Sequence, residues 1–107
     1  MKKLLFILML FSSTIFAQIE ATHFNAGWNE INNVPWFMDL DCKTKGHTDI
    51  AKNPDIAKKY KIAVVPTIII FKDGEEALRF QADLSFKMVA TKKEVIEAID
   101  ELLMSDF

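Results

Sequence analysis

Residues 67–71 (TIIIF) restrict the possible folds more than any other stretch of this 107-residue chain. The run is continuously β-branched and aromatic, which is typical of a central strand buried on both faces. Asp73-Gly74 then marks a hairpin turn, and residues 76–81 return with apolar side chains on one face. These signals predict an α/β domain whose final hairpin is antiparallel.

Capping patterns predict two helices around this hairpin. Asn53-Pro54 is a helix start, because Asn can cap and Pro suits the first helical position. Residues 91–94 (TKKE) form a capping box, and an apolar stripe at helical spacing follows: Val95, Ile96, Ile99, Leu102 and Leu103. The alternation in residues 19–24 predicts a strand. Residues 45–50 are expected to form another strand, and residues 33–40 a short helix with Pro35 in its first turn.

The first 17 residues have the layout of a cleavable secretory signal. Residues 1–3 are positively charged, residues 4–11 are apolar, and residues 12–17 end in Ala17. The apolar run is short for a membrane span. We expect residues 1–17 to be a signal peptide and residues 18–107 one domain, exported to the periplasm or secreted, with no stable membrane anchor after cleavage. An uncleaved N-terminal anchor is the alternative.

Charge and cysteine content narrow the function classes. Acidic residues outnumber basic ones by 15 to 13, and Lys2 and Lys3 belong to the expected signal. No basic patch with interleaved aromatics stands out, so nucleic acid is not expected as a partner. Cys42 is the only cysteine, which excludes an internal disulfide in a chain expected to meet an oxidising compartment.

Two stretches resemble the thioredoxin family. Residues 53–75 (NPDIAKKYKIAVVPTIIIFKDGE) resemble the C-terminal half of a thioredoxin, and residues 23–32 (HFNAGWNEIN) resemble the strand and turn that carry its Trp-Cys-x-x-Cys motif. The resemblance covers most of residues 18–107. It implies a thioredoxin-like fold in a minimal version that lacks the family's first strand and helix. It also implies a cis Val65-Pro66 bond, whose proline helps to hold substrate peptides in extended form.

The family's two cysteines are replaced here by Asn29 and Asn32, with Glu30 and Ile31 between them. Disulfide exchange needs a thiolate of lowered pKa and a resolving thiol. A carboxamide supplies neither, so dithiol disulfide reductase activity is not expected and the turn is interpreted as redox-inactive. The two asparagines are expected either to bind a ligand or to cap the helix that the cysteines would have started.

The favoured hypothesis is a non-catalytic module that binds an extended peptide or a protein by backbone pairing beside the cis proline. Its candidate binding residues are Trp28, Asn29, Asn32, Val65, Pro66 and Thr67. Phe86 and Met88, in the 82–90 segment, are expected to lie exposed beside them. The alternative is thiol–disulfide exchange through Cys42 with a thiol of a partner. A lone cysteine is also often a small buried hydrophobe, and a domain with no remaining site is a third possibility.

Both histidines stand at notable positions. In the family, the positions of His23 and His47 hold a buried Asp and a Lys beneath the redox pair. We therefore expect the two imidazoles on neighbouring strands, as a buried, hydrogen-bonded pair. A pH-sensitive or metal-binding pair is the alternative. Two ligands alone make an incomplete metal site, and no metal or other cofactor is predicted.

Overall fold

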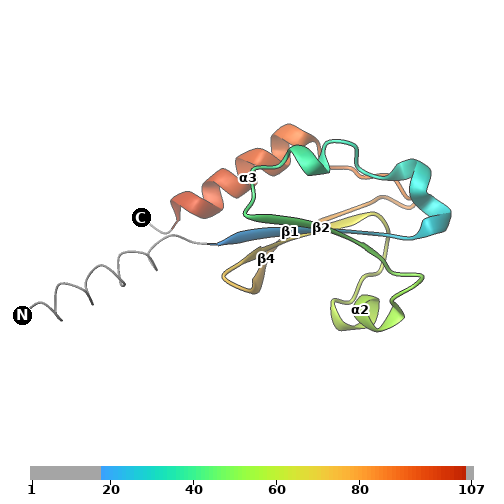
Figure 1. The fold of residues 1–107 in the computed structure, drawn as a ribbon. Coiled ribbons are helices and arrows are strands. Elements are labelled where there is room, and N and C mark those ends of the chain that lie inside the picture. The colour runs from blue at the N-terminus through green and yellow to red at the C-terminus, as the bar shows by residue number, and fades with distance from the viewer. Residues whose placement is uncertain (1–17, 106–107) are drawn as a thin grey trace, which may run out of the picture.

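The computed structural model describes residues 18–105 (Figure 1). The predicted signal peptide lies outside the described residues. In chain order the elements are the strand β1 (Ile19–Asn25), the 3-10 helices η1 (Gly27–Asn32) and η2 (Phe37–Asp39), the strand β2 (Thr44–Asp49), the helix α2 (Pro54–Lys59), the strands β3 (Thr67–Lys72) and β4 (Glu75–Gln81), and the helix α3 (Lys92–Met104).

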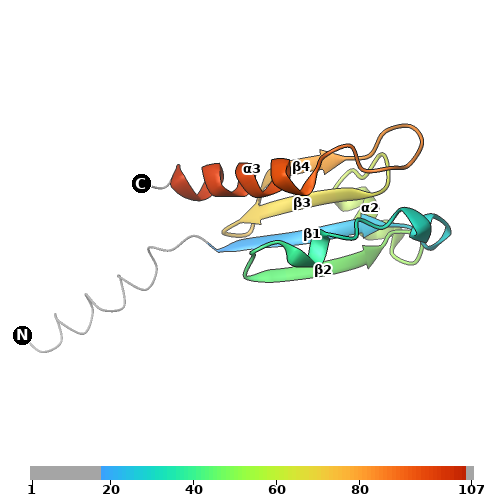
Figure 2. The same ribbon diagram turned by 90° about the horizontal axis from the view of Figure 1, so that it is seen from above.

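The four strands form one mixed sheet in the order β2-β1-β3-β4 (Figure 2). β1 runs parallel to β2 and antiparallel to β3, and β3 and β4 form the predicted antiparallel hairpin. The hairpin turn is built from Asp73 and Gly74, both with positive φ, as a tight two-residue turn requires. The prediction of an α/β domain with a mixed sheet is therefore confirmed.

The main core lies between the sheet and the layer formed by α3 and η2, which cover the same face (Figure 1). The alternation of β1 places Ile19 and Ala21 on this face, and β3 adds Ile68 and Ile70. Val34, Phe37, Leu40, Val95 and Ile99 complete the buried set. The capping box predicted at the start of α3 is also confirmed: Thr91 Oγ1 accepts from the Glu94 N–H at 3.2 Å, and Glu94 Oε1 accepts from the Thr91 N–H at 3.1 Å.

The opposite face of the sheet carries α2 (Figure 1). The Tyr60 ring lies 5.7 Å from the Phe24 ring and 5.6 Å from the Phe71 ring, centroid to centroid. Arg79 of β4 donates to the Tyr60 carbonyl at 2.6 Å and to the Lys61 carbonyl at 3.1 Å. These contacts fix the end of α2 against β3 and β4, and so position the segment that leads to Val65-Pro66.

One local prediction was wrong. Residues 33–40 contain only the single turn η2 instead of an α-helix, and the backbone bonds there join residues three apart, such as the Phe37 N–H and the Val34 carbonyl at 3.2 Å. The predicted helix start at Asn53-Pro54 is confirmed, since Asn53 stands at the N-cap of α2 and Pro54 is its first residue; the Asn53 side chain makes no cap bond and donates to the Asp49 carbonyl at 3.0 Å. Within residues 18–105, no helix combines the length and apolar character that crossing a bilayer requires.

Candidate functional site

Three segments distant in sequence meet at one end of the sheet. η1 follows the C-terminal end of β1, Val65-Pro66 precedes the start of β3, and the 82–90 segment follows the end of β4. The register pairs Phe24 with Thr67 and Thr67 with Gln81, so the antiparallel strands bring these three connections to the same edge. The Val65-Pro66 bond is cis, the isomer that the resemblance implies. We call residues 82–90 the cover loop.

Asn29, at the position of a family cysteine, is buried and joins all three segments. Its Nδ2 has acceptors at Asn25 Oδ1 (3.0 Å), Phe86 O (3.2 Å) and Val65 O (3.4 Å). A carboxamide nitrogen carries two hydrogens, so the three acceptors share two hydrogens. One side chain therefore ties the turn to both the proline segment and the cover loop.

Three further asparagines surround Asn29. Asn32 Nδ2 donates to Asn29 Oδ1 at 2.8 Å. Asn25 Nδ2 donates to the Asn29 carbonyl at 3.0 Å and to Asn33 Oδ1 at 2.5 Å. The prediction that Asn29 and Asn32 cap a helix was wrong, since the N-cap of η1 is Ala26, which makes no side-chain bond. Sequence reasoning missed Asn25 and Asn33, and their spacing from Asn29, four residues on either side, was the available signal.

The structure brings the six predicted binding residues together but buries most of them. Asn29 is 4% exposed, Val65 3% and Thr67 0%, and Pro66 is fully buried. Trp28, in contrast, is 65% exposed. Because the Val65 carbonyl already accepts from Asn29, the backbone beside the proline is not open for pairing in this conformation.

The cover loop is a preformed turn organised by Asp83. Its Oδ1 accepts from the Ser85 hydroxyl at 2.6 Å and from the backbone N–H groups of Ser85 and Lys87 at 2.9 and 3.2 Å. These bonds, that from the Ser85 hydroxyl first, hold the pKa of the Asp83 carboxyl below its ordinary value. The loop is anchored at its base by an Ala82–Met88 bridge and by the Ala82 N–H, which donates to the Pro66 carbonyl at 3.0 Å.

Phe86, at the loop tip, has a φ of 63°, a left-handed backbone conformation that costs a side-chain-bearing residue about 1–2 kcal/mol. Its carbonyl accepts from Asn29 Nδ2, and its ring lies edge-on to Trp28 with centroids 5.1 Å apart. A neutral hydrogen bond contributes about 1 kcal/mol net. The left-handed conformation belongs to the turn itself, in which the Phe86 N–H donates to the Asp83 carbonyl at 3.1 Å and the Asp83 N–H donates to the Lys87 carbonyl at 2.9 Å.

Large apolar side chains are exposed around this site. Trp28 and Ile31 on η1 and Leu84, Phe86 and Val89 on the cover loop are between 41% and 94% exposed. We call these five residues the apolar surface. Beside it lies a recess of about 270 Å³ whose lining includes Ile31, Trp36, Lys87 and Met88. Met88 packs partly against the core, so the prediction of an exposed side chain holds for Phe86 but not for Met88. The surface is of a kind that commonly marks protein interaction sites.

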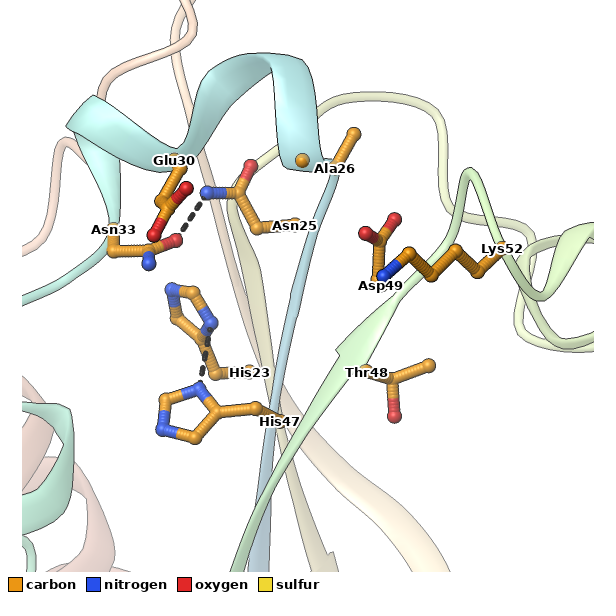
Figure 3. Close-up of a pocket in the computed structure, with 10 residues that line it drawn as sticks. His23, Asn25, Ala26, Glu30, Asn33, His47, Thr48, Asp49 and Lys52 are labelled. Carbon is orange, nitrogen blue, oxygen red and sulfur yellow. Dashed lines mark hydrogen bonds between the residues drawn. The ribbon is translucent and has the colours of Figure 1, made fainter.

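The two histidines form the predicted contact on neighbouring strands, with Nδ1 atoms 3.1 Å apart (Figure 3). His23 Nε2 accepts from the Val34 N–H, so a neutral His23 carries its proton on Nδ1 and donates it to His47. His47 then keeps its own proton on Nε2. Burial, together with the neighbouring His47, lowers the pKa of His23 to about 4.

Only half of this pair is buried, which corrects the sequence prediction. His23 is 2% exposed, whereas His47 is exposed, because β2 is an edge strand of the described sheet. His47 faces a polar recess of about 440 Å³ whose lining includes Glu30, Asp49 and Lys52 (Figure 3). Among residues 18–105, no cluster of three or more His, Cys, Asp or Glu side chains is arranged to hold a metal ion.

Comparison with known proteins shows similarity to thioredoxins in both sequence and fold. No protein-family model matches the chain. Over 55 residues it is 46% identical to chloroplastic thioredoxin Y1 of Arabidopsis thaliana, an alignment that covers 51% of this chain and 28% of that protein. The fold is similar to that of a mutant thioredoxin from Halobacterium salinarum NRC-1 (TM-score 0.56, 19% identity, 82% of this chain and 74% of the other). It is also similar to thioredoxin-2, described as a component of malaria parasite protein secretion machinery (TM-score 0.59, 19% identity, 79% and 84%).

This chain has a thioredoxin-like fold and is similar in sequence to thioredoxins. The predicted family resemblance and fold are thus confirmed, while the chain spans little more than a quarter of the curated relative's length. In this thioredoxin-like domain both positions of the family's cysteine pair hold asparagine, and Cys42 is the only thiol.

The remaining thiol lies far from the asparagine cluster. The next residue, Lys43, donates its N–H to the carbonyl of Ile19, which places Cys42 beside the start of β1, opposite the end that leads into η1. Cys42 packs partly against the core. Burial raises the pKa of its thiol, with nearby Lys45 opposing the effect. A raised pKa reduces the thiolate fraction at neutral pH, and the thiolate is the nucleophile in disulfide exchange.

Proposed function

We propose that this thioredoxin-like domain is a redox-inactive module that binds a protein partner through its apolar surface. The observation that carries the proposal is the pairing of large exposed apolar side chains with an unreactive turn. Trp28 and Phe86, both part of that surface, contact each other, and a tryptophan anchor is a frequent source of binding energy in protein interfaces. The Asn29 side chain beneath them can form hydrogen bonds but has no thiol for disulfide exchange.

Export is part of the same proposal. The charged, apolar and small-residue pattern of residues 1–17 supports a signal peptide, and the partner is then a periplasmic or extracellular polypeptide. The excess of acidic residues argues against nucleic acid as the partner.

Partner capture tests the binding proposal. Residues 18–107, immobilised and exposed to an envelope extract, are compared with a Trp28→Ser/Ile31→Ser double variant and with Met104→Ser. Met104 is a matched control, because it is 70% exposed on α3, outside the apolar surface. We expect a polypeptide that the wild type and Met104→Ser retain and the double variant loses, and that rebinds after purification. Retention by all three proteins alike would contradict the proposal.

An insulin-reduction assay tests the proposal that the domain is redox-inactive. We expect the wild type and Cys42→Ala to give the same background rate, because the thiol has a raised pKa. Activity in the wild type that disappears in Cys42→Ala would instead establish monothiol exchange through Cys42 and overturn the assignment of redox inactivity.

A further inference from the structure

We propose that the cover loop is a gate over the proline segment and that Asn29 is its latch, so that an extended segment of the partner reaches Val65 only after the loop opens. The inference rests on the proposed function, because it assigns how the same site is regulated and which part of a partner it receives. It concerns one conformational step on this chain and can be measured without the partner.

The latch is the carboxamide nitrogen of Asn29, which reaches two backbone carbonyls. Asn29 Nδ2 lies 3.2 Å from Phe86 O at the loop tip and 3.4 Å from Val65 O before the proline. With the loop in place, Asn29 and Val65 are 4% and 3% exposed. The same carboxamide thus holds the loop and occupies the carbonyl that an incoming backbone would need.

The loop is built to move as a unit. Asp83 holds the turn together from within, through its bonds with Ser85 and Lys87. Opening therefore leaves these bonds intact and breaks the contacts that Phe86 makes with Asn29 and Trp28. Phe86 keeps its positive φ, because that conformation belongs to the turn, in which the Phe86 N–H donates to the Asp83 carbonyl at 3.1 Å.

Opening would free a donor and an acceptor that suit a polypeptide backbone. Asn29 Nδ2–H can donate to a carbonyl, and Val65 O can accept from an N–H. An extended segment supplies both groups in alternation along its length. The apolar surface would meet the partner first, and backbone pairing beside Val65 would follow the displacement of the loop.

The Asn29→Asp variant tests the latch, because it keeps the shape of the side chain and replaces its N–H donors by oxygen. At neutral pH the carboxylate faces the Phe86 and Val65 carbonyls, and we expect the loop to open. Once protonated at low pH, the carboxyl can donate one hydrogen bond, and we expect the loop to close again. Asn29→Ala should be open at both pH values. The ionisable side chains on η1 and the loop tip, Glu30, Asp83 and Lys87, are the same in every variant.

Asn33→Asp is the matched control. It makes the same charge change in the same turn, but Asn33 acts through its Oδ1, an acceptor that aspartate retains. We expect it to stay closed at both pH values. The readout is the NOE between the Trp28 and Phe86 rings, together with the backbone amide shifts of residues 83–87. A closed loop in Asn29→Asp at neutral pH, or in Asn29→Ala, would overturn the proposal.

The wild-type protein provides a measurement that does not depend on whether the variants fold. The Asn29 side-chain amide should exchange its hydrogens at least tenfold more slowly than that of exposed Asn33. Equal rates would overturn the latch. Since no partner is present, failure here leaves partner capture by the apolar surface untouched, whereas failure of that capture leaves the latch untouched.

Discussion

Two clusters of polar side chains lie at η1 and beneath it, and they differ in the chemical groups that form their buried hydrogen bonds. The asparagine cluster around Asn29 uses carboxamides, which keep the same donors and acceptors at every pH. The pair of His23 and His47 uses imidazoles, in which each bond depends on where a proton sits. The stability contributed by the asparagine cluster should therefore not depend on pH, whereas the contribution of the histidine pair should.

The largest effect is expected from acidification of the wild type. His23 has a pKa of about 4 in the folded protein and an ordinary value of 6.5 when unfolded. Between these pH values His23 is protonated in the unfolded chain but neutral in the folded protein, so the free energy of unfolding falls as pH drops from about 6.5 to about 4. The loss attributable to this group is up to about 3 kcal/mol.

Urea unfolding at a series of pH values measures this loss, with His23→Gln as the control. The glutamine oxygen can still accept from the Val34 N–H, and the side chain does not titrate. We expect a shallower pH dependence in the variant by about the same amount. Identical slopes in the two proteins would show that the imidazole is not the responding group.

A smaller effect is expected from Asn29→Ala, which should lower the free energy of unfolding by about 2 kcal/mol, because it leaves the buried acceptor on Asn25 without its donor and removes the bonds to Val65 and Phe86. The loss should be the same at pH 7 and pH 5, since no titrating group is removed. Chemical denaturation at both pH values gives the comparison. A loss that changes strongly with pH would mean that the two clusters are coupled.

Thr91→Ala should cost about 1 kcal/mol by removing the capping box of α3. The helix start lies outside both clusters, so the Trp28–Phe86 contact and the histidine tautomers should persist. Nitrogen-15 spectra of the imidazoles and the ring–ring NOE report on these features. Loss of either would indicate that the clusters respond to general destabilisation.

The smallest effect concerns Cys42. Because burial raises the pKa of its thiol, alkylation by iodoacetamide in the native protein at pH 7 should be slower than that of the unfolded chain by several fold. Thiol labelling followed by mass spectrometry gives both rates. Native labelling as fast as that of the unfolded chain would restore Cys42 as a reactive group.

Local patterns predicted most of the fold, but not the contacts between distant residues. The β-branched run of β3, the Asp73-Gly74 turn and the Thr91–Glu94 capping box each act within a few residues, so they could be read from the sequence. The bond from the Val34 N–H to the His23 ring joins residues 11 positions apart, so it could not be predicted in this way. The spacing of apolar and polar residues within a short stretch of sequence does not indicate such a contact.

The candidate site was predicted in outline, but its accessibility was not. The resemblance placed Asn29, Val65 and Pro66 together. It gave no sign that Asn29 would reach the Val65 carbonyl 36 residues away and the Phe86 carbonyl 57 residues away. The exposure of His47 depends equally on sheet order, because an edge strand has a partner on one side only.

The burial of Asn29 also bears on whether the turn could regain thiol chemistry. Cysteines restored at positions 29 and 32 would recreate the motif, but the first sulfur would lie at a position that is 4% exposed, beneath the cover loop. A bulky disulfide could not approach it while the loop stayed closed, and the carbonyls now served by Asn29 would lose their donor. Two substitutions alone would therefore not give an accessible dithiol, since the cover loop would still lie over the first sulfur.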